Sequence, residues 1–104
     1  PSNIAKNHPS AMVLEVEGNC MNRVIPEGSH VLLDSTITPS NGSIVVVETE
    51  DYQAIMRRWY KGNNSLMLTS DSYEEFEDLI FTSNEQSIKV IGTVVWFQAA
   101  KELG

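Results

Sequence analysis

The chain has 104 residues, enough for one domain with a modest core, and 41% of them are apolar, which excludes a disordered protein. Seven Lys and Arg stand against fourteen Asp and Glu, and the resulting net charge of −7 argues against direct contact with DNA phosphates. No apolar run approaches the roughly 18 residues of a membrane span, and one Cys cannot form an internal disulfide. We therefore expect a cytoplasmic protein with no membrane contact.

The first ten residues differ in composition from the rest of the chain. They hold two Pro, two Asn and two Ser without hydrophobic periodicity, which is typical of a linker. We expect residues 1–10 to be a linker or arm and residues 11–104 to form one folded domain. Because the chain starts with Pro1 rather than Met, we also expect it to be a piece of a longer protein.

From Met12 onward the pattern is that of short β-strands separated by turn residues. Pro-Glu-Gly precedes the second segment, and Asn41-Gly42, a strong tight-turn pair, precedes the third. No amphipathic helix is evident, so the expected fold is mainly β: a compact single domain with little helix. The segments expected as strands are 12–16, 31–33, 44–47, 52–59, 66–68 and 88–97.

Three details of these strands are also predicted. The β-branched run 44–47 does not alternate with polar residues, which indicates burial on both faces. Segments 52–59 and 66–68 flank Gly62-Asn63-Asn64 and should form a hairpin. Gly92, inside the last strand, indicates a bulge or a close approach of another backbone.

Cys20 is the first candidate for chemistry. It follows Gly18-Asn19, a turn pair that can present the next side chain at the end of a strand. A reactive Cys needs a nearby cation or base that favours the thiolate. The alternative is an inert, small, buried side chain, as most free Cys are.

Arg57 and Arg58 are the second candidates. They lie in an expected strand, so their side chains should point to opposite faces. A guanidinium cannot act as a general base because it keeps its proton, although it can stabilise a neighbouring thiolate. The alternative is that both are surface cations beside acidic neighbours.

Other residues give weaker signals. A dyad of Cys20 with His30 is conceivable, but His8 and His30 lie at no recognisable spacing from the Cys. No Cys/His cluster predicts a metal site, and no Gly-rich loop predicts a phosphate site; we expect no metal and no cofactor. The acidic run between Asp71 and Asp78 is best read as a solvated loop, because the central Gly of a calcium loop is missing.

Five segments of the chain, taken in order, form a recognisable set: Leu-Glu-Val-Glu-Gly-Asn-Cys-Met (14–21), Ile-Pro-Glu-Gly-Ser-His-Val-Leu-Leu-Asp (25–34), Asn-Gly-Ser-Ile-Val-Val-Val (41–47), Ala-Ile-Met-Arg-Arg-Trp-Tyr (54–60) and Ile-Gly-Thr-Val-Val (91–95). Together they resemble the C-terminal domain of the LexA, UmuD and lambda-type phage repressors. The resemblance covers about residues 12–97, and the spacing between Cys20 and Arg57 is like that between the family's nucleophile and its lysine.

The resemblance implies a self-cleaving peptidase fold with a Ser nucleophile and an uncharged, buried Lys as base. Carried over by position, Cys20 stands where the family has Ser and Arg57 stands where it has Lys. The backbone amides of Asn19 and Cys20 would then hold the oxyanion.

Both substitutions change the chemistry. Ser to Cys keeps a nucleophile, whereas Lys to Arg removes the base and leaves no well-matched acid for the leaving amine. General acid–base help is worth about 10²–10⁴-fold in rate, so we expect self-cleavage to be slow or absent. The Ala-Gly or Cys-Gly bond that the family cleaves is also missing from the 19 residues before Cys20.

The first functional hypothesis is a dimerisation and regulatory domain of a LexA-like or prophage repressor with a degenerate cleavage site. Such a homodimer would contact operator DNA only through an N-terminal domain outside this chain, and induction could come from an antirepressor or a recombinase filament, as in an SOS response. The alternatives are an active self-processing peptidase with Cys20 as nucleophile and a UmuD-like accessory subunit. By resemblance, the dimer interface lies on the last strand, at Val90, Ile91, Thr93, Val95 and Phe97.

Overall fold

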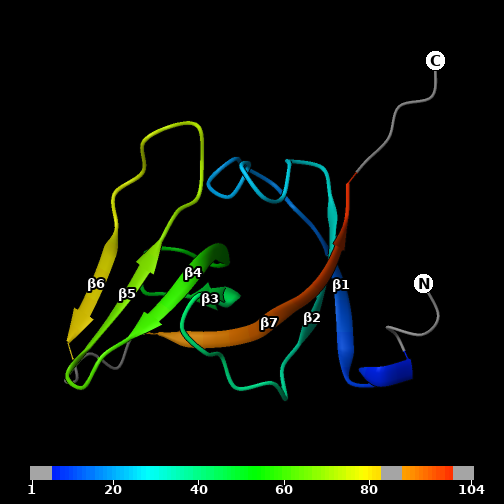
Figure 1. Ribbon diagram of the computed structural model, residues 1–104, viewed down its shortest axis with the longest axis horizontal. Coiled ribbons are helices and arrows are strands. Elements are labelled where there is room, and N and C mark those ends of the chain that lie inside the picture. The colour runs from blue at the N-terminus through cyan, green and yellow to red at the C-terminus, as the bar shows by residue number, and fades with distance from the viewer. Residues whose placement is uncertain (1–5, 83–87, 100–104) are drawn as a thin grey trace.

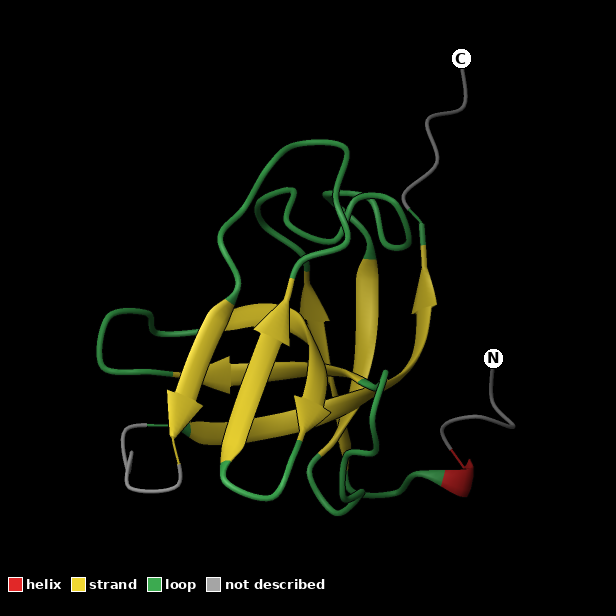
Figure 2. Cartoon of the chain, turned by 60° about the vertical axis from the view of Figure 1, so that its left-hand side comes forward, coloured by secondary structure: helices red, strands yellow, loops and turns green. Residues whose placement is uncertain are grey.

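The fold is a single antiparallel sheet of seven strands, seen in a computed structural model that describes residues 6–82 and 88–99 (Figure 1). Within these residues the only helical segment is a short turn at residues 6–7, before the first strand (Figure 2). The mainly β fold class is therefore confirmed. The strands are β1 (Ala11–Glu15), β2 (His30–Asp34), β3 (Ile44–Glu48), β4 (Ile55–Lys61), β5 (Ser65–Thr69), β6 (Leu79–Thr82) and β7 (Lys89–Gln98).

The strand order is β1-β2-β7-β3-β4-β5-β6, so the last strand lies in the middle of the sheet. β7 is the longest strand and joins two halves: its first part, from Lys89 to Thr93, pairs with β3, and its second part, from Thr93 to Gln98, pairs with β2. Figure 1 shows β7 curving through the molecule between these partners. The predicted hairpin is β4–β5, whereas β6 was not predicted, because its four residues follow an acidic run and carry little pattern of their own.

The core has two parts, on opposite faces of β3. Val46 packs in a cluster with Leu33 and Met56, and Val45 and Val47 pack in a second cluster with Leu68. The three valines of β3 are at most 5% exposed. The prediction of a strand buried on both faces is confirmed, and it explains why β3 lacks polar alternation.

At Gly92, β7 passes close to Leu33 of β2. A Cβ atom built on Gly92 would lie 3.1 Å from the Cβ of Leu33, closer than most real contacts. The pairing of β7 with β3 also changes register between Val46 and Val47, which are opposite Gly92 and Val90. Both readings of this glycine, a bulge and a close backbone approach, are therefore confirmed.

Two long connections lie together at one end of the sheet (Figure 1). One joins β1 to β2 and carries Cys20; the other joins β5 to β6 and carries the acidic run. Backbone hydrogen bonds tie them directly, since Asp71 N–H donates to Cys20 O at 2.9 Å and Arg23 N–H donates to Asp71 O at 3.0 Å. Within the described residues, no helix is long and apolar enough to span a membrane.

Candidate functional site

Two buried apolar side chains, Met21 and Ile25, anchor the turn that holds Cys20 in the core. Met21 and Ile25 are each 1% exposed, and Ile25 N–H donates to Met21 O at 2.7 Å, which closes a helical turn. Gly18, with φ at +88°, adopts the left-handed backbone that this entry into the turn requires. Cys20 is thereby held half-buried at the end of the sheet.

β4 places Arg57 in the interior and Arg58 on the other face, as predicted. Arg57 is 7% exposed and lies opposite Val45 of β3. Arg58 donates from Nε to a carboxylate oxygen of Asp71 at 3.1 Å and from Nη1 to Gly42 O at 2.8 Å. The two neighbours differ in their charge partners. Arg58 pairs with the carboxylate of Asp71, whereas Arg57 is buried and forms no ion pair among the described residues.

The structure brings Cys20 and Arg57 together at a single acceptor, the carbonyl oxygen of Met56. The Cys20 Sγ donates to it at 3.2 Å and the Arg57 Nη1 donates to it at 3.0 Å. Two segments far apart in sequence therefore bring a thiol and a guanidinium to one shared carbonyl oxygen. Their roles as a dyad remain a prediction.

A carbonyl oxygen can only accept a hydrogen bond, so the contact between Cys20 Sγ and Met56 O suits a thiol that acts as a weak donor. Arg57 donates to the same oxygen. The two side chains therefore share one acceptor.

Arg57 has an unusual environment for a buried charge. Within the described residues, no Asp or Glu oxygen lies within ion-pair distance of it, and its Nε is buried without an acceptor. Its Cζ lies 5.6 Å from the centre of the Phe76 ring, so an aromatic face covers the guanidinium. A buried cation with a carbonyl and a ring as partners is only partly compensated.

The backbone amides of Asn19 and Cys20 are free of protein acceptors. No hydrogen bond among the described residues uses either N–H as donor. Free amides beside the candidate nucleophile are compatible with the oxyanion role, which remains a prediction. His30 is exposed at the start of β2, and neither hydrogen bond described for the Cys20 residue involves it.

The segment 71–76 crosses the Cys20 turn, and we call it the strap. Beyond the two backbone bonds of Asp71, Asn22 accepts hydrogen bonds from Ser72 Oγ and Tyr73 N–H, both at 3.0 Å. Phe76 then closes over Arg57. The sequence predicts a solvated loop here, and its Glu side chains are exposed. Asp71 and Phe76 are partly buried instead, and no local sequence pattern predicts their contacts.

The residues predicted for the dimer interface differ in where β7 places them. Val90 and Ile91 pack against the two core clusters. Thr93 is 5% exposed and donates from Oγ1 to Ile37 O at 3.0 Å, so its side chain is used within the fold. Val95 is half-buried and Phe97 is 36% exposed, and their role in an interface remains a prediction.

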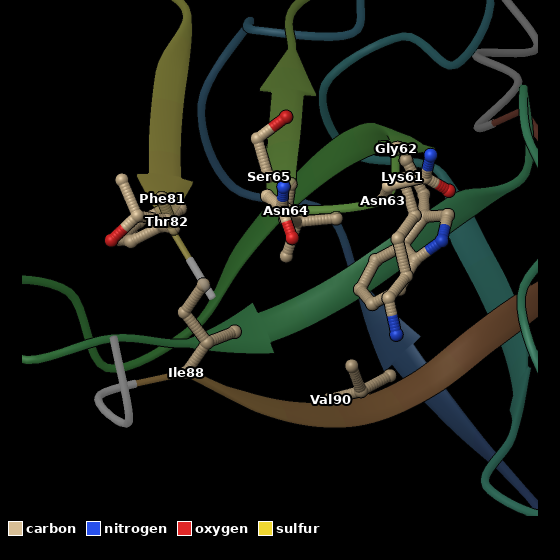
Figure 3. Close-up of a pocket in the computed structure, with 11 residues that line it drawn as sticks. Lys61, Gly62, Asn63, Asn64, Ser65, Phe81, Thr82, Ile88 and Val90 are labelled. Atoms are coloured by element: carbon tan, nitrogen blue, oxygen red, sulfur yellow. The ribbon is translucent and has the colours of Figure 1, made fainter. Parts of the chain in front are cut away.

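Residues of β4 line several hollows. A groove of about 210 Å³ lies between the end of β1 and the start of β4, from Leu14 to Met56. A pocket of about 240 Å³ lies at the β4–β5 turn, and its lining includes Trp59 together with Asn64, Ile88 and Val90, which are labelled in Figure 3. Within the described ranges, no group of three or more His, Cys, Asp or Glu could hold a metal ion.

The resemblance assigns a peptidase dyad to these two positions, one on a strand and one on a tight turn of a β scaffold, and in this structure they meet at Met56 O. The comparisons with known proteins agree with that class. The Peptidase S24-like family model matches residues 1–95, and the chain belongs to this family.

The chain is similar to curated proteins called LexA repressor. It is 30% identical to that of Lacticaseibacillus casei, over 80% of this chain and 38% of that protein. It is 30% identical to that of Listeria innocua, over 88% of this chain and 45% of that protein, and 36% identical to that of Exiguobacterium sp., over 77% of this chain and 39% of that protein. The chain thus spans less than half the length of these relatives.

Proposed function

We propose that this chain is the dimerisation and regulatory domain of a LexA-like repressor whose self-cleavage site no longer transfers protons. The observation that carries the proposal is the buried guanidinium of Arg57 at the position where the resemblance expects the basic Lys. The chain's similarity to repressors supports the regulatory role. Its net charge of −7 supports contact with operator DNA through another domain of a cytoplasmic protein.

The chemistry of the dyad supports loss of cleavage. A guanidinium stays protonated and cannot take the proton of the nucleophile, and the Cys20 thiol is hydrogen-bonded to Met56 O rather than to a base. Without general acid–base help the rate falls by about 10²–10⁴-fold. Induction of such a repressor would then depend on a protein partner, such as an antirepressor, instead of on cleavage.

The pairing of β7 supports a homodimer. β3 pairs with β7 only as far as Thr93, whereas β2 continues to Gln98. Over residues 94–98 the other edge of β7 has no strand partner among the described residues, and Phe97 exposes its ring there. An open edge with an exposed aromatic side chain suits antiparallel pairing with a second copy.

A second candidate function is an active self-processing peptidase that uses Cys20. The free amides of Asn19 and Cys20 favour it, because they could hold an oxyanion beside the sulfur. The missing proton acceptor argues against it, and this difference is what an experiment can measure.

The test is incubation of the full-length protein at alkaline pH, followed by electrophoresis. We expect the wild type to stay intact. We expect Arg57→Lys to give two fragments at a rate that rises with pH, because an amine can lose its proton and act as base. Cleavage of the wild type that disappears in Cys20→Ala would establish the peptidase instead.

A further inference from the structure

We propose that the open edge of β6, together with the turn at residues 49–52, is a docking site for a basic, extended peptide segment of a partner protein. The inference goes beyond the proposed function, which concerns the dyad and β7, and it uses none of those residues. It follows from the unpaired edge of the strand, from the hollow beside it and from the charges that line this hollow.

β6 is one end of the sheet, and its backbone is open on one side. It pairs with β5, from Leu79 opposite Leu68 to Thr82 opposite Ser65, and no described strand pairs with its other edge. Figure 1 shows β6 and β1, the other edge strand, on opposite sides of the molecule. An unpaired edge presents N–H and C=O groups that an added strand can satisfy. β6 can therefore accept one more strand.

The side chains of β6 anchor the strand and leave its outer face free. Leu79 and Phe81 pack against the second core cluster, on the inner face. Ile80 lies between them, so its side chain points to the other face, and it is 68% exposed. The strand is thus held by alternate side chains, while Ile80 presents an apolar group to solvent next to the open edge.

A hollow of about 320 Å³ lies between β6 and the turn at residues 49–52. Two hydrogen bonds close this turn, from Thr49 N–H to Tyr52 O at 2.8 Å and from Tyr52 N–H to Thr49 Oγ1 at 3.0 Å. Tyr52 is 47% exposed and lines the hollow together with Ile80. A segment that enters the hollow therefore meets two apolar side chains on a fixed frame.

The charge of the hollow favours a basic occupant. Glu50, Asp51 and Asp78 line it, all three exposed, and no Lys, Arg or His is among its lining residues. None of these carboxylates forms an ion pair within the part of the chain that the structure describes. Lys or Arg side chains of a partner would complement them. A second copy of this chain suits the hollow less well, because it brings fourteen acidic residues against seven basic ones.

The experiment is an NMR titration of the ¹⁵N-labelled protein with a capped peptide, Lys-Val-Lys-Val-Lys-Val-Lys, and with the same peptide carrying Glu in place of Lys. Alternation lets Val lie beside Ile80 while Lys meets the carboxylates. We expect the amide signals of β6 and of residues 49–52 to shift and saturate with the Lys peptide alone, and those of β1 to stay in place. Shifts at β1 or β7 instead, or no shift at all, would overturn the proposal.

Two double variants of equal charge separate a site from general attraction to an acidic protein. Glu50→Gln with Asp51→Asn removes two carboxylates from the hollow and should weaken binding of the Lys peptide about fivefold. Glu74→Gln with Glu75→Gln removes two from the exposed face of the strap and should change binding less than about twofold. Equal weakening in both would show attraction to net charge alone and would contradict the site.

Two further measurements decide how the edge is used and by what. Hydrogen exchange of the β6 amides should slow when the Lys peptide is bound, because an added strand pairs with them; unchanged exchange would overturn the use of the open edge. Unlabelled protein added to labelled protein should leave the β6 signals in place, and shifts there would make a second copy the occupant. Self-cleavage is measured separately, so failure here would leave the proposed repressor role standing.

Discussion

The Cys20 thiol and the Arg57 guanidinium differ from a Ser–Lys pair in what they can do with a proton. In the structure both are donors, and both donate to the carbonyl oxygen of Met56. A peptidase dyad needs one donor and one acceptor. In the proposed dyad neither group is a base, and for this reason we propose that the site does not transfer protons.

Phe76 lies over one member of this pair, Arg57. Its ring covers the Arg57 guanidinium at 5.6 Å, on the strap that crosses the Cys20 turn. We expect Phe76→Ala to increase the rate of Cys20 alkylation by iodoacetamide several-fold. Tyr73→Ala is the matched control, because Tyr73 is 77% exposed and covers Arg23 rather than the dyad; an equal increase in both variants would contradict a specific cover.

Asp34 makes the free energy of unfolding of the domain depend on pH in the acid range. The side-chain hydroxyl and the backbone amide of Thr36 donate to its carboxylate and, with His8, hold the pKa of Asp34 below its ordinary value of 3.8. A lowered pKa in the folded state adds stability above the ordinary value, and this is lost as the pH falls through the folded value. Urea unfolding should be measured at neutral pH and at about pH 3. Between these two pH values the free energy of unfolding should fall more for the wild type than for Asp34→Asn.

Exposed Asp51 provides the comparison for this measurement. Asp51→Asn should retain the acid dependence of the wild type. If Asp34→Asn lost as much stability as the wild type over the same pH range, the hydrogen bonds at Asp34 would not be the origin of the effect.

At the scale of elements, the close packing of β7 against its neighbour β2 depends on Gly92. A methyl group there would meet the Cβ of Leu33 at 3.1 Å, and both strands are held by pairing on their other sides. We expect Gly92→Ala to lower the free energy of unfolding by about 1–3 kcal/mol. Gly62→Ala, where the nearest atom is Ser65 Oγ at 3.5 Å, should change it far less, and equal effects would contradict the role of close approach.

The strap depends most on Asp71, which ties it to the Cys20 turn and to β4. Its carboxylate accepts from Arg58 at 3.1 Å and lies 3.7 Å from Arg23 Nε. We expect Asp71→Ala to lower the free energy of unfolding by about 1 kcal/mol, because about a third of the side chain is exposed and water weakens the pairs. Glu74→Ala, at an exposed position on the same strap, should have no measurable effect in the same urea titration.

The sequence predicts those features whose interacting residues lie close together along the chain. The β3 strand, the β4–β5 hairpin and the Gly92 bulge follow from residues within a few positions of one another. The pairing of Cys20 with Arg57 could be predicted only because both segments resemble a known family. β6 and the strap contacts of Asp71 and Phe76 could not, because they depend on partners distant in sequence and on side chains that have no local pattern.

At the scale of the whole molecule, the open edge of β7 predicts self-association. Phe97 is 36% exposed beside that edge. In sedimentation experiments we expect a dimer for the wild type and a shift toward monomer for Phe97→Ser, because the aromatic contact is lost. Tyr52→Ser, at an exposed aromatic residue before β4, should remain dimeric; a monomeric wild type at every concentration would rule out this interface.

The most direct measurement of the central claim is the rate at which iodoacetamide alkylates Cys20 in the folded protein and in the urea-unfolded protein at neutral pH. The account predicts a slower reaction in the folded state, since the thiol donates to Met56 O and lies under the strap. A folded-state reaction faster than that of the unfolded chain would show a thiolate activated by Arg57, and would contradict the account.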